Sequence, residues 1–177
     1  MTWHQLTCFG DTVAPDWLLK ARLKRVSHRC LALDYELLAP AAEVIWPTAS
    51  ISPQRRDELW LSTCLELFIA TPAGQPYWEI NLSPTGDWNL YHLDDYRQGL
   101  KPDPDIEPIN IRSNSAADHH QLHAMLQVPP ALLEAPKLQA NLCAVLQHVN
   151  NTNSYWAVCH PGHEADFHAR AGFVLEV

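Results

Sequence analysis

Residues 63–93 decide the fold, and they read TCLELFIATPAGQPYWEINLSPTGDWNLYHL. Three runs in this stretch, 63–70, 77–83 and 87–93, alternate between apolar and polar side chains and contain aromatic residues, a pattern typical of strands. The sequence PTGD at 84–87 lies between the last two runs and supplies residues that tight turns prefer. The stretch therefore predicts consecutive antiparallel strands, with a hairpin across the last two runs.

Similar short runs recur along the rest of the chain. They lie at 30–38, 120–128, 138–148, 154–160 and 173–177. Few segments have helical periodicity, and the two short helix candidates lie at 16–23 and 130–134. Seven or more strands with turns at close intervals are typical of a β-sandwich. We therefore predict an all-β chain folded as an antiparallel β-sandwich with one or two short helices.

The chain length predicts one domain over residues 1–177. The longest break, Lys101 to Pro108, contains three prolines, which disfavour a regular helix or a central strand. Because neither flank is large enough to be a comfortable domain alone, we interpret this break as a loop inside the domain.

The composition limits which classes of partner and which cellular locations are expected. Lys and Arg number 12 against 20 Asp and Glu, so the net charge is −8, and this field disfavours nucleic acid. No segment approaches the 18 or so consecutive apolar residues of a membrane span, and the N-terminus lacks the pattern of a signal peptide. Five scattered cysteines without a C-x-x-C pair indicate reduced thiols. We therefore expect a cytoplasmic protein.

Alternation along 77–83 divides its side chains between two faces of a sheet. Trp78, Ile80 and Leu82 share one face, which we assign to the core. Tyr77, Glu79 and Asn81 share the other face with Ser83. Successive polar residues on one face indicate either a solvated outer surface or a ligand-binding one.

Glu66 lies between Cys64 and Phe68 on one face of its strand, opposite the apolar row on the other face. A carboxylate with apolar neighbours is costly unless it is paired or exposed. Glu66 is therefore expected to form a salt bridge, with Arg97 or Arg112 as candidate partners, to contact a ligand or cation, or to face solvent.

Seven tryptophans are many for this length, and most are expected to build the core. Trp46 and Trp60 lie where a strand is expected to meet a loop, from which an indole ring can project over a sheet face or its rim. Both are candidates for ligand contact.

The C-terminal stretch 160–173 is rich in potential metal ligands. His160, His163, Asp166 and His168 have a spacing that permits zinc or nickel. Because Pro161 and Gly162 make this stretch a loop without helical register, the histidines can equally serve as hydrogen-bonded props for the loop.

Three blocks together carry a family resemblance. They are DELWxxTCLELF at 57–68, YWEINLSPxGxWxxY at 77–91 and DDYR at 94–97, and the ending DFHxRxGF at 166–173 extends the similarity to the end of the chain. The sequence resembles a bacterial DOMON-like group that is related to the family 9 carbohydrate-binding modules.

The resemblance implies a β-sandwich whose relatives bind sugars between tryptophans, with structural calcium in some of them. The positions of this sequence that match the family's motif, and to which the resemblance assigns ligand contact, are Trp60, Glu66, Glu79, Asn81 and Tyr91. Together with the residue-based candidates, the predicted ligand-binding set is Trp46, Trp60, Glu66, Tyr77, Glu79, Asn81, Tyr91 and Arg97.

Other DOMON relatives bind haem through a Met and a His. Met125 lies in the run 122–128, on the same alternating face as His123 and Gln127. The resemblance therefore implies a haem alternative with Met125 and His123 as ligands, against the alternative that Met125 packs in the core.

We predict a non-enzymatic module that binds a carbohydrate or a similar polar small molecule. The alternatives are a haem protein and a metal-dependent enzyme built on the C-terminal His/Asp loop, and a protein partner stays open. The chain has no G-x-S-x-G, P-loop, G-x-G-x-x-G or H-E-x-x-H motif to indicate a specific catalytic mechanism.

Overall fold

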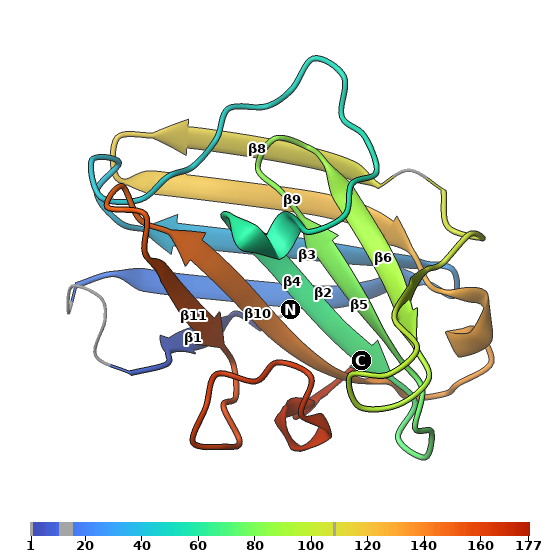
Figure 1. Ribbon diagram of the computed structural model, residues 1–177. Coiled ribbons are helices and arrows are strands. Elements are labelled where there is room, and N and C mark those ends of the chain that lie inside the picture. Colours follow the sequence, from blue (N-terminus) through green and yellow to red (C-terminus); the bar gives the residue numbers. More distant parts are fainter. Residues whose placement is uncertain (1, 11–15, 108) are drawn as a thin grey trace.

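Strands dominate the computed structural model of the protein, which describes residues 2–10, 16–107 and 109–177 (Figure 1). Within these residues, twelve strands hydrogen-bond into one curled sheet in which every strand pairing is antiparallel. The strands are β1 (His4–Cys8), β2 (Leu18–Ser27), β3 (Cys30–Leu38), β4 (Cys64–Ala70), β5 (Tyr77–Leu82), β6 (Trp88–Leu93), β7 (Lys101–Pro102), β8 (Asn110–Ala116), β9 (His119–Gln127), β10 (Gln139–Gln147), β11 (Asn153–Ala157) and β12 (Leu175–Glu176).

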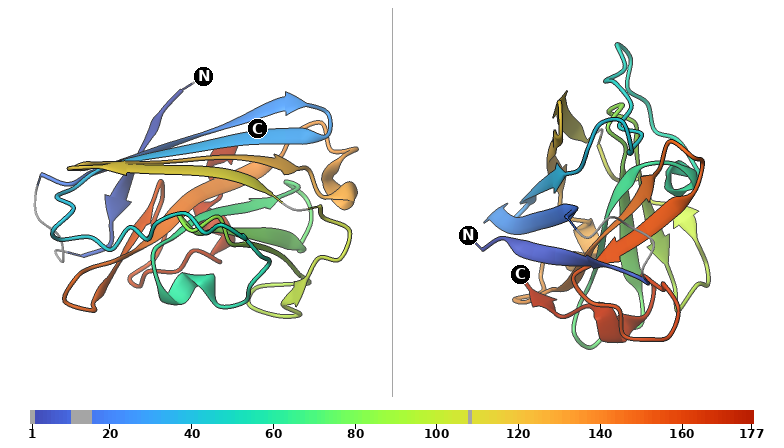
Figure 2. Two further views of the ribbon diagram at one scale, coloured as in Figure 1. Left: turned by 90° about the horizontal axis from the view of Figure 1, so that it is seen from above. Right: turned by 90° about the vertical axis from the view of Figure 1, so that its left-hand side faces the viewer.

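The sheet curls into two facing layers, as Figure 2 shows. The β9 layer has the order β8-β9-β3-β2, and the β4 layer has the order β7-β6-β5-β4-β10-β11, with β12 beside β10. Strand β1 joins the layers at one side because its first half pairs with β2 and its last residues pair with β11. The predicted all-β antiparallel class is confirmed, and the two facing layers are consistent with the predicted sandwich.

The main hydrophobic core fills the space between the layers. Leu33 and Leu122 enter it from the β9 layer, and Leu67 and Ile80 enter it from the β4 layer. The hydroxyl of Tyr35, on β3, donates a hydrogen bond of 2.5 Å across the core to the backbone oxygen of Glu66. Packing and this hydrogen bond therefore hold the two layers together, in addition to the strand pairings of β1.

Removing the interlayer hydrogen bond should lower stability. We expect Tyr35→Phe to reduce the free energy of unfolding by about 1 kcal/mol, the usual net value of a buried hydrogen bond. Denaturant unfolding measures the change. Tyr155→Phe is the matched control, because the hydroxyl of Tyr155 makes no hydrogen bond among the described residues, and a loss equal to that of Tyr35→Phe would contradict the prediction.

The strand predictions are confirmed for most of the chain. Each of the eight predicted strands overlaps an observed one, and the predicted run 30–38 matches β3 residue for residue. The proline-rich loop contains the two-residue edge strand β7, and Pro108 lies outside the described residues. An edge position tolerates proline because one side of the strand needs no hydrogen-bond donor.

The predicted helix at 16–23 is wrong. Residues Leu18–Ser27 form β2, which pairs with both β1 and β3. Leu19 and Ala21 are fully buried while their neighbours are partly exposed, so the burial period is two, as in a strand. Tertiary pairing overrides the helix-forming leucines and lysine of this segment.

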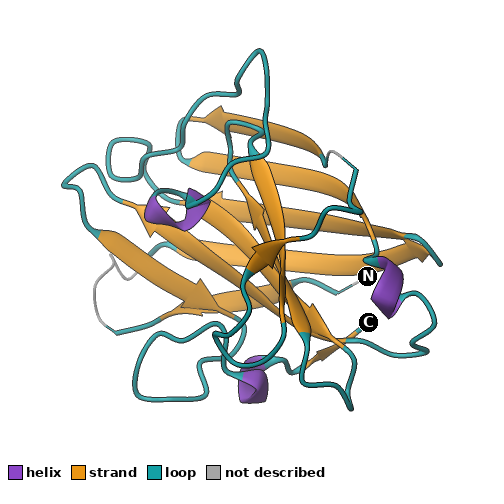
Figure 3. Ribbon diagram, turned by 45° about the vertical axis from the view of Figure 1, so that its right-hand side comes forward, coloured by secondary structure: helices purple, strands orange, loops and turns teal. Residues whose placement is uncertain are grey.

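The helical content consists of three 3-10 turns, which Figure 3 shows in purple. They span Leu59–Leu61, Pro130–Leu132 and Arg170–Gly172, and the second coincides with the candidate at 130–134. Among the described residues, no helix is long and apolar enough to span a membrane.

A second, smaller core covers the outward face of the β4 layer. Strands β4 and β5 are buried on both faces, and Phe68 and Tyr77 point away from the main core. The C-terminal segment, residues 158–174, brings Phe167 and Phe173 against them. This cover turns the polar face predicted for 77–83 into a largely enclosed surface.

Candidate functional site

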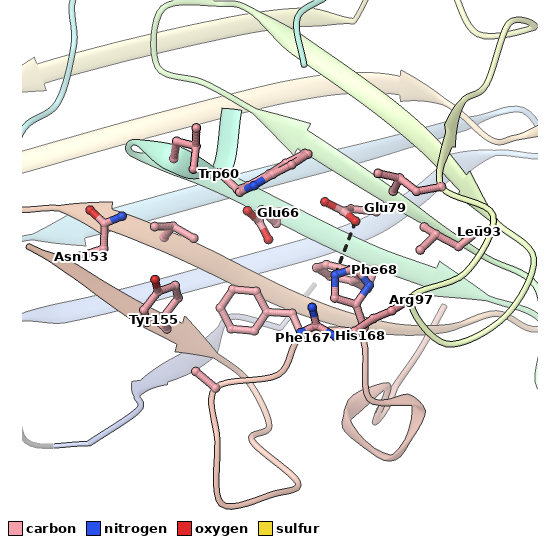
Figure 4. A pocket seen from close by; sticks show the side chains of 14 residues that line it. Trp60, Glu66, Phe68, Glu79, Leu93, Arg97, Asn153, Tyr155, Phe167 and His168 are labelled. Atoms are coloured by element: carbon pink, nitrogen blue, oxygen red, sulfur yellow. Dashed lines mark ion pairs between the residues drawn. The ribbon is translucent and has the colours of Figure 1, made fainter. Parts of the chain in front are cut away.

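A cavity of about 440 Å³ opens over the outward face of the β4 layer (Figure 4). Strands β4, β5, β6, β10 and β11 contribute side chains to it, and the 3-10 turn at Leu59–Leu61, the β6–β7 loop and the C-terminal segment complete it. Its lining residues are Trp60, Leu61, Glu66, Phe68, Glu79, Leu93, Arg97, Leu100, Val145, Asn153, Tyr155, Ala165, Phe167 and His168. Segments far apart in the sequence therefore meet at one site.

Aromatic rings form much of the wall. Figure 4 shows Trp60 on one side of the cavity and Phe167 and Tyr155 on the other. The ring of Phe167 lies 6.1 Å from that of Phe68 and 6.2 Å from that of Tyr155, measured between centroids. Tyr155 remains 41% exposed, so its ring offers an open surface at the edge of the site. Such walls suit a ligand with an apolar face.

Two carboxyl groups lie on the floor between these walls. Glu66 on β4 is 2% exposed and Glu79 on β5 is 4% exposed. The strand register places Glu66 opposite Asn81, so the two glutamates are diagonal neighbours on one face. Asn81 donates a hydrogen bond of 2.8 Å to Oε1 of Glu79, whereas Oε1 of Glu66 is buried and has no partner among the described residues.

The surroundings favour the protonated form of both carboxyls. Burial, with the charge of Glu79 adding to it, raises the pKa of Glu66 well above its ordinary value. Burial also raises the pKa of Glu79, although the hydrogen bond from Asn81 and the charge of Arg97 act in the opposite direction. A carboxyl that holds its proton can donate one hydrogen bond as well as accept others.

His168 is held by a chain of hydrogen bonds behind the cavity. The backbone N–H of Arg97 donates to the hydroxyl oxygen of Tyr77 at 3.2 Å, and that hydroxyl lies 2.7 Å from Nδ1 of His168. Burial and then the charge of Arg97 lower the pKa of His168 to about 4, so the ring is neutral at pH 7. If Tyr77 donates to Nδ1, the remaining proton of the ring is on Nε2, which lies 3.8 Å from Oε2 of Glu79.

Arg97 is anchored at the rim by Asp166. Its Nη2 donates a hydrogen bond of 3.0 Å to Oδ1 of Asp166, and the Tyr96 hydroxyl donates one of 2.8 Å to Oδ2. Burial acts to raise the pKa of Asp166, but the hydrogen bonds from Tyr96 and Arg97 outweigh it and lower the pKa. Asp166 therefore stays ionised and ties the β6–β7 loop to the C-terminal segment.

The tight β6–β7 loop sets the position of Arg97. Arg97 adopts a φ of 52°, and Gly99 adopts a φ of 71°. A Cβ atom at Gly99 would lie 2.1 Å from a carboxylate oxygen of Asp94, so glycine is required there unless Asp94 moves.

The structure brings together most of the predicted ligand-binding residues. Trp60, Glu66, Glu79 and Arg97 line the cavity, and Tyr77 and Asn81 support its polar groups from behind. Tyr91 packs its ring 5.8 Å from that of Trp60 and donates a hydrogen bond of 2.8 Å to Asp57. Of the three alternatives for Glu66, the ion pair with Arg97 or Arg112 is not formed among the described residues and the side chain is not exposed, which leaves contact with a ligand or cation.

Trp46 lies elsewhere. Its indole Nε1 donates a hydrogen bond of 3.0 Å to Ser113 on β8, and its ring stacks on His120 of β9 at 5.2 Å. The strand-to-loop position predicted for Trp46 therefore places the ring against the β9 layer and not in the cavity.

Sequence reasoning missed the residues that close the site from β11 and the C-terminal segment. Asn153, Tyr155 and Phe167 are the main ones. Alternation could have placed Tyr155 on the face opposite Trp156, since the run 154–160 was expected to be a strand. Nothing in the sequence indicates that the C-terminal segment folds back over β4.

The structure does not gather the four candidate metal ligands. His160 lies 2.9 Å from the backbone oxygen of Thr7, His163 is exposed, and Asp166 and His168 make the contacts described above. Among the described residues there is no group of three or more His, Cys, Asp or Glu side chains that could hold a metal ion.

The candidate haem ligands lie on β9, on the outer face of the β9 layer. Nδ1 of His123 lies 2.7 Å from Oδ1 of Asp34 on β3, and Met125 follows two residues later on the same face. Two side chains that project from one strand in the same direction cannot bind an iron ion from opposite sides, as the two axial ligands of a haem do.

Comparison with known proteins finds solved structures of similar fold. No protein-family model matches the chain, and no curated protein matches it by sequence. A solved structure of a candidate carbohydrate-binding protein from Bacteroides uniformis matches with a TM-score of 0.67 at 11% identity, over 98% of this chain and 84% of that one.

Two structures of a family 9 carbohydrate-binding module from Caldicellulosiruptor kristjanssonii also match. The complex with glucose has a TM-score of 0.51 at 11% identity and covers 88% of this chain and 73% of that one. The complex with cellotriose has a TM-score of 0.54 at 12% identity and covers 89% and 72%. The chain has the fold of a family 9 carbohydrate-binding module. The likeness to family 9 modules is one of fold, and the DOMON part of the resemblance stays a prediction.

Proposed function

We propose that the protein binds a sugar ring in the cavity over β4 and β5. The observation that carries this proposal is the combination of aromatic walls with buried polar groups in one open cavity. A volume of about 440 Å³ is within the usual range for small-molecule sites. The carbohydrate-binding proteins among the structures of similar fold support the same class of ligand.

Each part of the cavity has a role in this proposal. The ring of Trp60 on one side and those of Phe167 and Tyr155 on the other cover the apolar faces of the sugar. The carboxyls of Glu66 and Glu79 exchange hydrogen bonds with its hydroxyls. Binding of this kind needs the donors and acceptors in fixed positions, which the hydrogen bond from Asn81 to Glu79 provides.

Removal of the Trp60 ring should separate binding from folding. We expect Trp60→Ala to weaken the binding of mono- and oligosaccharides by at least about tenfold, roughly 1.4 kcal/mol. The melting temperature should change little, because Trp60 lies at the rim and its main ring contact is with Tyr91. Isothermal titration and thermal melting of the same samples measure both quantities.

Trp46→Ala is the matched control for this experiment. It removes the same side chain from a site outside the cavity, so it should leave sugar affinity unchanged and lower the melting temperature. Unchanged sugar affinity in Trp60→Ala, or an equal loss in Trp46→Ala, would contradict the proposed site.

A further inference from the structure

The cavity contains more acidic groups than its cations can balance. Glu66 and Glu79 lie on its floor, and Asp166, which lies in the chain between the lining residues Ala165 and Phe167, pairs with Arg97 beside it. Arg97 is the permanent cation among the described lining residues, and its one ion pair is with Asp166. His168 is neutral at pH 7, because its pKa is lowered to about 4 by burial and by the charge of Arg97. The two glutamates therefore have no cation of their own.

Glu66 is the carboxyl for which the missing partner is clearest. Its side chain is 2% exposed and lines the cavity, and its Oε1 has no hydrogen-bond partner among the described residues. A buried oxygen without a partner is costly, and native proteins satisfy nearly all such atoms. The missing partner of Glu66 is therefore expected to come from the bound ligand.

A metal ion is a poor candidate for that partner. Calcium takes six to eight oxygen ligands, whereas the described residues contain no group of three or more potential metal-ligating side chains. The rest of the wall is mostly aromatic and aliphatic, with Trp60, Phe68 and Phe167 near the carboxyls. Aromatic faces attract organic ammonium groups and do not replace the oxygen shell of a metal ion.

We propose that the sugar bound in this cavity carries a protonated amino group, which pairs with Glu66 and Glu79. This inference rests on the proposed sugar-binding function and narrows its ligand class to amino sugars. An ammonium group brings three donors and a positive charge, so it can donate to Oε1 of Glu66 and, by its charge, stabilise the ionised forms of the two carboxyls, which burial otherwise disfavours. A hydroxyl can donate a hydrogen bond to the oxygen but brings no positive charge to stabilise an ionised carboxyl.

Titration with three related sugars tests the inference. Glucose, glucosamine and N-acetylglucosamine differ in the group on one ring carbon, and among them only glucosamine is cationic. At about pH 7 we expect glucosamine to bind at least about tenfold more tightly than either neutral sugar. In Glu66→Gln this preference should fall below about threefold, because the amide cannot carry a negative charge.

Glu36→Gln is the matched control variant. Glu36 lies on the outer face of the β9 layer, where it pairs with Lys20 at 2.7 Å, so the change removes one carboxylate far from the cavity. The preference for glucosamine should persist in this variant. Its loss in Glu36→Gln would show that net charge, and not the cavity, selects the amine.

The failures of the two proposals are distinguishable. Equal affinity for glucose and glucosamine would overturn the amino-sugar inference and leave sugar binding in place. A melting-temperature rise with calcium chloride that is lost in Glu66→Gln would overturn it in favour of a metal site. No binding of any of the three sugars, or of a panel of oligosaccharides, would overturn the proposed function itself.

Discussion

Phe167→Ala should lower the free energy of unfolding by about 3 kcal/mol, the low end of the usual cost of truncating a buried phenylalanine. Phe167 is 8% exposed and joins the C-terminal segment to the outward face of the β4 layer. Its ring packs 6.1 Å from Phe68 and 6.2 Å from Tyr155. Because total stabilities are usually only about 5–15 kcal/mol, a loss of this size is readily seen in denaturant unfolding.

The same change should also abolish sugar binding. Without the Phe167 ring, the cavity loses one wall, and the C-terminal segment that carries Asp166 and His168 loses its ring contacts with Phe68 and Tyr155. Val174→Ala is the control, since Val174 lies in the same segment and is 55% exposed. If Phe167→Ala is as stable as the wild type, the second core contributes little to the stability of the fold.

The strands of the β4 layer could be predicted because alternation reports the two faces of a sheet. Trp78, Ile80 and Leu82 enter the main core, as their positions indicated. The missed strand β2 has the same period of two in its burial, but its leucines, arginines and lysines are also good helix formers. Its pairing with β1 and β3 is non-local and has no signal within the segment itself.

The floor of the site could be predicted, whereas its cover could not. Glu66 and Glu79 stand out in the sequence as carboxyls on strands whose neighbours are apolar or aromatic. The cover depends on how residues 158–174 cross the sheet, and that path is set by contacts such as Phe68 with Phe167 and Arg97 with Asp166. The same contacts explain why the His/Asp-rich stretch serves as the wall of a cavity, with Asp166 and His168 bound to neighbouring side chains.

The unliganded protein should gain stability when Glu66 is replaced by glutamine. Glutamine keeps the shape of the side chain but cannot ionise, so it removes the cost of either burying the Glu66 charge or protonating this carboxyl above its ordinary pKa. We expect Glu66→Gln to raise the free energy of unfolding by about 1–3 kcal/mol at pH 7. For a chain of this size, each kcal/mol corresponds to roughly 2–4 °C in melting temperature.

The gain should depend on pH in a defined direction. The pKa of Glu66 is raised in the folded state above the ordinary value of 4.5, so above that pH the unfolded chain loses a proton that the folded chain retains. Wild-type stability therefore falls as pH rises from about 4.5 towards the folded-state pKa, and it levels off beyond it. The advantage of Glu66→Gln should be near zero at about pH 4 and largest at neutral and higher pH.

Glu36→Gln supplies a control of opposite sign. The hydrogen bond from Lys20 is the main cause of the lowered pKa of Glu36, so its charged form stabilises the folded state above the unfolded-state pKa. Because this pair is partly exposed, its loss should cost less than about 1 kcal/mol at pH 7 and nothing at low pH.

A pH-independent difference in stability between Glu66→Gln and the wild type would contradict the assignment of Glu66 as a buried carboxyl without a cation. If the stability advantage of Glu66→Gln instead grows with pH and shrinks when glucosamine is added, the ligand relieves the cost of the buried Glu66 carboxyl.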